Sequence, residues 1–145
     1  MCPDAEHSVF FDYFHTRDAS LSTETPSRIE GIGRPRVEAS FLPDVIDTMV
    51  KVPDRWSIAA MRELSTRLGR RVGPSTGTNF VGALVAAQHL ADTGQHGSVV
   101  TVLCDGGERY VDTCYDEHWL TAQGLTCDAE QRALSAWMDS GTAPR

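Results

Sequence analysis

The sequence predicts an α/β protein, a partial parallel sheet with flanking helices. Between residues 45 and 104, strand-like and helix-like segments alternate in the order strand, helix, strand, helix, strand. This order implies parallel strands joined by right-handed crossovers. The last segment, SVVTVLC at 98–104, is almost continuously apolar and β-branched, which is typical of a parallel strand covered on both faces. A length of 145 residues fits one domain of ordinary size.

The first half of the chain has two regular segments by its pattern. SVFFDYF at 8–14 predicts a short helix with Ser8 as its cap, whereas the rest of 1–28 has no regular pattern. VIDTMVKV at 45–52 predicts a strand that Pro53 ends.

Two helices and a short strand follow. Asp54 is the expected N-cap of a helix that Gly69 ends, and its apolar residues recur at helical spacing: Ile58, Met61, Leu64 and Leu68. RRVG at 70–73 predicts a short strand, and FVGALVAAQHLADTG at 80–94 predicts a second helix. After residue 126, CDAEQRALSAWMD predicts a short amphipathic helix with a loose tail.

The composition excludes several functional classes. A net charge of −7 and a pI near 5.1 argue against a non-specific nucleic-acid binder. No apolar run reaches the ~20 residues of a membrane span, and the N-terminus does not resemble a secretory signal, so a soluble, cytoplasmic protein is expected. The four cysteines form no CxxC pair, so we expect reduced thiols and neither a metal site nor a disulfide framework.

The sharpest motif is the turn GPSTGTN at 73–79, between a predicted strand and a helix. Ligands of open α/β sheets lie beyond the carboxyl ends of strands, and the hydroxyls of Ser75, Thr76 and Thr78 are expected to point there. A plain helix cap explains the same residues equally well. GPSTG also fits the GxSxG turn of α/β-hydrolases, with Asp105 and His118 in that fold's chain order. No HGGG-type oxyanion loop accompanies it, and the chain is short for that fold.

Four stretches together resemble one family. They are SRIEGIGRPRV, VIDTMVKVPD, LGRRVGPSTGTN and VVTVLCDGGERYVDT. In this order and spacing they are similar to the C-terminal portion of the pyridoxal-phosphate-dependent cysteine synthase and cystathionine β-synthase family, fold type II. The segment FFDYFHTRD and the ending CDGGERY resemble most the actinobacterial cysteine desulfhydrase type. The resemblance covers residues 8–125, so we expect a family domain over 1–125 and a short helix and tail over 126–145.

The resemblance implies roles for individual residues. Ser75 matches the serine whose hydroxyl bonds the pyridine nitrogen of pyridoxal 5'-phosphate, and a neutral partner there favours β-elimination and β-replacement. Glu30, Gly31 and Gly33 match the loop on the substrate side of the pocket. Arg109 matches a turn near the ring, where we expect an ion-pair anchor. Whether the enzyme makes cysteine or degrades it stays open.

The resemblance also implies what these residues lack. In the family, the Schiff-base lysine, a substrate loop and a Gly/Thr-rich phosphate cup precede this region. Lys51 is the only lysine and matches no Schiff-base motif, so no catalytic residue is expected here. The predicted function is a cysteine-metabolism lyase or transferase acting on a small amino acid, present as an inactive C-terminal fragment. The alternative is a non-catalytic remnant or associating module.

A fragment of a parallel sheet is expected to associate. Strands such as SVVTVLC need cover on both faces, and the predicted helices supply only part of it. We therefore expect a homo-oligomer or association with a missing N-terminal portion, through an apolar surface that includes Phe10, Phe11 and Trp56.

Overall fold

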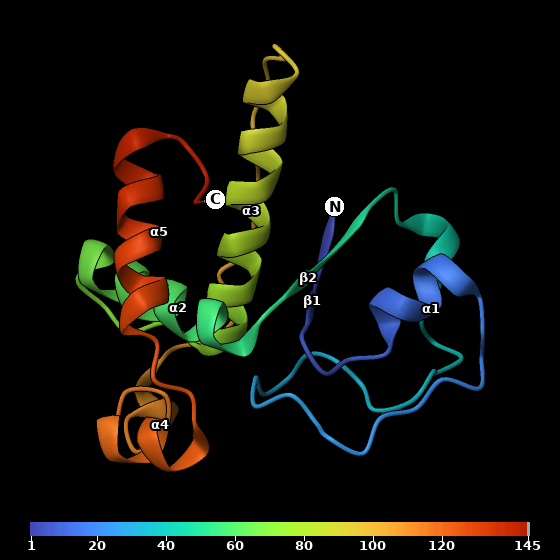
Figure 1. Ribbon diagram of the computed structural model, residues 1–145, viewed down its shortest axis with the longest axis horizontal. Coiled ribbons are helices and arrows are strands. Elements are labelled where there is room, and N and C mark those ends of the chain that lie inside the picture. The colour runs from blue at the N-terminus through green and yellow to red at the C-terminus, as the bar shows by residue number, and fades with distance from the viewer. Residues whose placement is uncertain (145) are drawn as a thin grey trace.

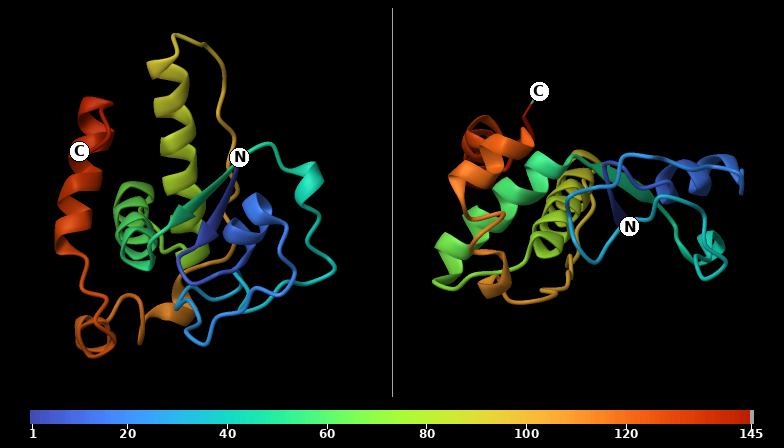
Figure 2. Two further views of the ribbon diagram at one scale, coloured as in Figure 1. Left: turned by 45° about the vertical axis from the view of Figure 1, so that its right-hand side comes forward. Right: turned by 90° about the horizontal axis from the view of Figure 1, so that it is seen from below.

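The computed structural model describes residues 1–144 and has a small sheet between two groups of elements (Figure 1). On one side stand the helices of residues 54–140, and on the other lie the short helix of residues 10–16 and the loops of residues 17–48 (Figure 1 and Figure 2). The elements are, in order, β1 (Cys2–Ala5), α1 (Phe10–Thr16), a 3₁₀ turn (Pro43–Val45), β2 (Met49–Val52), α2 (Asp54–Leu68), α3 (Pro74–Asp92), a 3₁₀ turn (Glu108–Tyr110), α4 (Glu117–Gln123) and α5 (Asp128–Ser140).

The sheet of the described residues has two parallel strands, β1 and β2. Their register runs from Cys2 opposite Met49 to Ala5 opposite Val52. The predicted strand at 45–52 is thus shorter than expected, since a 3₁₀ turn occupies its start. β1 lies in a region expected to be irregular, because CPDA has neither alternation nor strand-forming residues and takes its conformation from pairing with β2.

Helices α2 and α3 cross in very close contact. A Cβ atom on Gly77 would lie 1.9 Å from the Ser57 carbonyl oxygen and 2.8 Å from the Met61 nitrogen, so only glycine allows this approach. Beside it, the buried Thr78 hydroxyl donates to Ser57 Oγ at 2.8 Å. The crossing fixes the N-terminal end of α3 against the middle of α2.

The sequence predicts the C-terminal end of α2 correctly and its N-cap wrongly. Gly69 closes the helix in the left-handed region at φ 65°, as expected. Asp54 is the first helical residue and caps nothing in its own helix; the N-cap is Pro53. The buried Asp54 carboxylate instead accepts hydrogen bonds from Ser27 Oγ and the Arg28 N–H, each at 2.7 Å. Because these two donors of the loop occupy the carboxylate, it does not cap the helix.

Helix α5 begins and ends close to the predicted segment and packs against the rest of the chain. Leu134 and Trp137 are buried in one cluster with Val52, Ala60 and Val81. The Ala143 N–H also donates to Gln88 Oε1 of α3 at 3.0 Å. The division into 1–125 and 126–145 stays a prediction.

Two predicted strands are wrong. RRVG contributes a single antiparallel bridge between Val72 and Gly106. SVVTVLC forms no strand, and its residues are exposed. The reason is the same for both: a strand needs a neighbour for its backbone hydrogen bonds, and the described residues provide none at this position. The longest run of exposed apolar side chains therefore lies at 99–103, whereas Phe10, Phe11 and Trp56 are each half-buried.

None of the helices in the described part of the chain is long and apolar enough to cross a membrane.

We predict that Gly77→Ala destabilises the protein by about 2–3 kcal/mol, because the added methyl group forces α2 and α3 apart. Gly97→Ala is the matched control, since a Cβ atom there meets nothing within 4 Å. Urea unfolding of the two variants measures the difference, and equal free energies of unfolding would show that α2 and α3 do not cross at Gly77.

Candidate functional site

The candidate site starts at the N-terminus of α3, where three hydroxyl side chains have different environments. Thr76 Oγ1 accepts from the Cys104 N–H at 3.0 Å, and the Thr78 hydroxyl donates to Ser57. The expectation that all three hydroxyls face a ligand is therefore wrong for these two, which hold neighbouring segments. Ser75 is 6% exposed as a residue. Its hydroxyl takes part in none of the side-chain hydrogen bonds among residues 1–144, and it is open to solvent, since no fully buried side-chain oxygen of these residues lacks a partner. It is the hydroxyl of the turn that is left free for a ligand.

The turn after residue 104 packs directly on this end of α3. The Gly73 N–H donates to the Asp105 carbonyl at 3.0 Å, and a Cβ on Gly73 would lie 1.9 Å from Asp105 Oδ1. The Tyr110 hydroxyl donates to Asp105 Oδ2 at 2.7 Å. Burial, together with this bond to a carboxylate, raises the pKa of Tyr110 well above its usual range. Tyr110 therefore stays protonated and keeps Asp105 in place.

The loop that contains Glu30, Gly31 and Gly33 is anchored at both ends. At its start, Ile29 is 2% exposed within the core around α2, next to the bonds that Asp54 makes with 27–28. At its end, Ser8 Oγ accepts from the Arg34 N–H at 3.2 Å, and the Val9 N–H donates to the Arg34 carbonyl at 3.0 Å. Sequence reasoning interpreted Asp54 as a helix cap and missed this use of its carboxylate, because no local pattern indicates a partner 26 residues earlier in the chain.

The two glycines of this loop have positive φ angles, 86° at Gly31 and 71° at Gly33, which favour glycine. A Cβ on Gly33 would lie 3.1 Å from that of Ser8, whereas one on Gly31 would meet nothing within 4 Å. Both glycines line a cavity of about 330 Å³ that also contacts β1 and Phe41. Ser75 does not line this cavity.

An ion pair connects the loop to the turn. Arg109 Nη2 lies 2.9 Å from Glu30 Oε2, and both side chains are largely exposed. The Arg109 guanidinium also lies over the Tyr110 ring, 5.3 Å from its centroid. Arg109 is thus the ion-pair anchor that the sequence predicted. An exposed pair stabilises by less than about 1 kcal/mol, so it adds little to the bonds with Asp54 and Ser8 that hold the loop.

The remaining candidate groups are occupied or isolated. Lys51 Nζ is bonded to Asp12 Oδ2 at 2.9 Å and lies 5.2 Å from the Phe11 ring centroid. Among the described residues, no hydrogen bond joins Ser75, Asp105 and His118, and His118 is exposed on α4. The hydrolase alternative therefore has no assembled triad in this structure.

The cysteines are all free. Cys114 and Cys127 are buried, and burial raises the pKa of the Cys114 thiol to about 11. Such thiols are poor nucleophiles at neutral pH.

Comparisons with known proteins agree with the predicted family. The chain matches the family model described as "Pyridoxal-phosphate dependent enzyme" over residues 3–105. It is 55% identical to the L-cysteine desulfhydrase Cds1 of Mycobacterium tuberculosis over 84% of this chain and 33% of that protein. It is 31% identical to cysteine synthase 1 of Emericella nidulans, again over 84% of this chain and 33% of that protein.

A solved structure supports the fold. The O-acetylserine dependent cystathionine beta-synthase of Helicobacter pylori matches with a TM-score of 0.51 and 27% identity, over 76% of this chain and 32% of that one. The predicted α/β class and the family resemblance are thereby confirmed. The chain spans about a third of the length of the relatives it matches, as the shares of 33%, 33% and 32% show.

We predict that Asp54→Ala destabilises the protein by about 3 kcal/mol, because two donors of the loop lose a buried charged acceptor. Asp47→Ala, at an exposed position, is the control. Hydrogen exchange of residues 27–33 should also rise in Asp54→Ala only. Unchanged exchange would mean that Asp54 does not hold the loop.

Proposed function

Because this chain belongs to the family of pyridoxal-phosphate-dependent enzymes, we propose that it forms one wall of the cofactor site of a cysteine desulfhydrase. Such an enzyme breaks the Cβ–S bond of L-cysteine and releases sulfide. The proposal is supported by the 55% identity with the mycobacterial desulfhydrase, against 31% with cysteine synthase 1. The second candidate activity, cysteine synthesis from O-acetylserine, has the weaker support of the lower identity.

Ser75 is the residue of this wall that fits the cofactor best. The residue is nearly buried, whereas its hydroxyl is open to solvent, lacks a hydrogen-bond partner among the described residues and lies at the N-terminal end of α3. A neutral hydroxyl can bond the pyridine nitrogen without adding a charge to the site. When bound, pyridoxal phosphate supplies the electron sink that β-elimination requires. The single observation that carries the cofactor-binding role is this free hydroxyl, beside two threonines that are already engaged.

The loop at 30–33 is proposed as the substrate-side wall. Its glycines keep side chains out of the space that an amino acid would occupy, and Gly31 in particular faces open space. The ion pair between Glu30 and Arg109 brings the loop into contact with the turn that packs on Gly73. Neither Glu30 nor Arg109 is proposed to move a proton.

The rest of the site is proposed to come from polypeptide outside these residues. Lys51 is engaged by Asp12, and no other lysine exists in the sequence. By itself the chain is therefore proposed to be inactive, to act in the cytoplasm only when completed, and to associate with the portion that completes it. The remnant alternative differs in one respect, since it predicts no activity even after completion.

The test is a chimera in which these 145 residues replace the matching third of the mycobacterial desulfhydrase. We expect the chimera to bind pyridoxal phosphate and release sulfide from L-cysteine. Ser75→Ala should weaken cofactor binding about fivefold, the equivalent of ~1 kcal/mol for one neutral hydrogen bond. Ser75→Asp should change the partition of products more, because a carboxylate favours a protonated ring nitrogen.

The control for Ser75 is Ser135→Ala, since Ser135 is also a helical serine without a side-chain hydrogen bond in the described structure. Its cofactor affinity should equal that of the parent chimera. A folded chimera that binds cofactor but releases no sulfide would contradict the proposed activity, and equal effects of the two serine variants would contradict the role of Ser75.

We predict further that the isolated chain forms no covalent adduct with pyridoxal phosphate at Lys51, because Lys51 lies on β2, is paired with Asp12 and matches no Schiff-base motif. Incubation with cofactor, borohydride reduction and peptide mapping measure this. A stoichiometric adduct on Lys51 would contradict both the prediction and the assignment of the missing lysine to another portion.

A further inference from the structure

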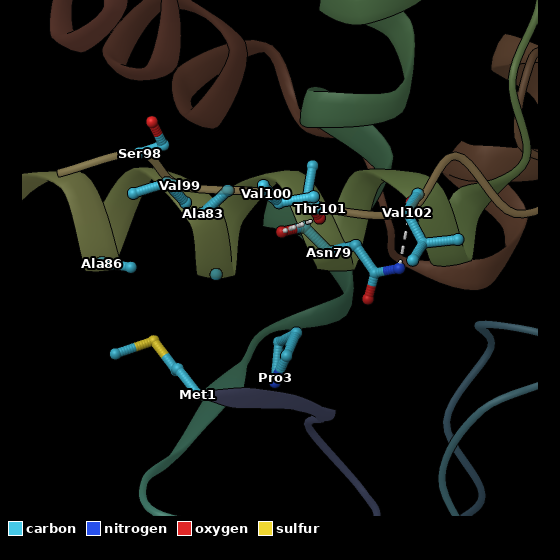
Figure 3. Close-up of a pocket in the computed structure, with 11 residues that line it drawn as sticks. Met1, Pro3, Asn79, Ala83, Ala86, Ser98, Val99, Val100, Thr101 and Val102 are labelled. Atoms are coloured by element: carbon cyan, nitrogen blue, oxygen red, sulfur yellow. Dashed lines mark hydrogen bonds between the residues drawn. The ribbon is translucent and has the colours of Figure 1, made fainter.

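A buried carboxylate, that of Asp4 in β1, lies beside the loop of residues 30–34, the glycine loop. The residue is only 4% exposed. Its neighbour Pro3 projects from β1 toward α3 (Figure 3), where a Cβ atom on Gly82 would lie 2.9 Å from the proline ring. Because side chains alternate along a strand, Asp4 projects to the opposite face, where α1 and the glycine loop lie.

The Asp4 carboxylate provides the hydrogen-bond acceptor at the start of α1. This helix has no side-chain cap at Val9, and Asp4 Oδ2 accepts from the Phe11 N–H at 2.9 Å. Lys51 of β2 is opposite Asp4 in the strand register, and its amine is paired with Asp12 of α1 at 2.9 Å. The first turn of α1 is therefore attached to both strands of the sheet.

Ser8 connects this carboxylate to the glycine loop. Its hydroxyl oxygen accepts from the Phe10 N–H at 3.3 Å and from the Arg34 N–H at 3.2 Å. Both lone pairs are then used, so the hydroxyl hydrogen is available to an acceptor. Burial raises the pKa of the Asp4 carboxyl, and the nearby Ser8 hydroxyl and Phe11 N–H oppose this rise because they favour the ionised form.

The end of the glycine loop packs closely on the turn that follows β1. A Cβ atom on Gly33 would lie 3.1 Å from the Ser8 Cβ and 3.3 Å from the Ala5 Cβ. The Val9 N–H also donates to the Arg34 carbonyl at 3.0 Å. A displacement of Ser8 would therefore displace the end of the loop.

We propose that Asp4 is a positioning residue for the substrate-side wall. Through Ser8, it sets the position of Gly31 and Gly33, which line the same cavity as Asp4, and so the space that an amino acid would have. The inference rests on the proposed function, since it concerns the same wall. Asp54 holds the start of the loop and Asp4 its end. Asp4 neither contacts the substrate nor moves a proton in this role.

The test is Asp4→Asn in the chimera described above, with L-cysteine as substrate. Asparagine keeps the shape and an acceptor for Phe11, but it loses the charge and can place an N–H group where Ser8 needs an acceptor. We expect KM to rise about fivefold and kcat to change by less than about twofold, because the wall is displaced and Ser75 is not. Asp47→Asn, at an exposed position, is the matched control and should leave both constants unchanged.

A second variant tests the connection through Ser8. Ser8→Ala removes the hydroxyl between the carboxylate and the loop, so KM should rise to a similar extent. The double variant should then be no worse than the larger single change, since both substitutions interrupt one connection. Effects on KM that multiply would overturn the proposal. So would a KM of Asp4→Asn equal to that of Asp47→Asn, or an effect confined to kcat.

Hydrogen exchange of the isolated chain separates this inference from the proposed activity. In Asp4→Asn, the Arg34 N–H should exchange at least about fivefold faster, whereas the Arg28 N–H, which is bonded to Asp54, should keep its rate. Unchanged exchange at Arg34 would overturn the proposal even in an active chimera. Equal acceleration at both positions would indicate a general loss of stability and would also overturn it.

A chimera that binds cofactor but releases no sulfide would refute the activity alone. The role of Asp4 is then decided by titrating the absorbance of the bound cofactor with L-cysteine. A midpoint that is about fivefold higher in Asp4→Asn than in Asp47→Asn supports the proposal, and equal midpoints overturn it.

Discussion

The close crossing of α2 and α3 is the contact on which the rest of the structure depends. Since Gly77 lies against the backbone of Ser57, the first turn of α3 has one possible position relative to α2. Thr78 uses its hydroxyl in that contact, and Thr76 uses its own to hold the segment that returns along α3. The position of Ser75, with a free hydroxyl between the two, follows from these neighbours. A change that separates the helices would therefore alter the candidate site together with the core.

The site is assembled from three segments that are distant in the sequence. Asp54 and Ile29 fix the start of the glycine loop, Asp105 fixes the turn against Gly73, and Arg109 connects the two. All these contacts are made within the described chain. The proposed wall is therefore held by contacts of this chain alone, and in the proposed enzyme the lysine for covalent chemistry comes from other polypeptide.

The sequence predicts the helices better than the strands, for a physical reason. Helices α2 and α5 satisfy their backbone internally, so local signals such as Gly69 and the helical spacing of apolar residues predict them closely. Helix α3 is predicted only in part, since it begins at Pro74 and the predicted segment begins at Phe80, and α4 has no counterpart among the predicted segments. A strand depends on a neighbour. CPDA becomes β1 because β2 lies beside it, and SVVTVLC stays unpaired despite its strong pattern. For the site, the motif identifies Ser75, but the engagement of Thr76, Thr78 and Asp54 depends on tertiary contacts that no local pattern reveals.

The central claim is that Ser75 presents a free hydroxyl to the ring nitrogen of pyridoxal phosphate. A crystal structure of the chimera with cofactor measures it directly. The account predicts that Ser75 Oγ lies within hydrogen-bond distance of the pyridine nitrogen, roughly 2.7–3.2 Å, with Thr76 and Thr78 still bonded to Cys104 and Ser57. A pyridine nitrogen bonded to a different side chain, or a Ser75 hydroxyl turned toward the protein, would contradict it.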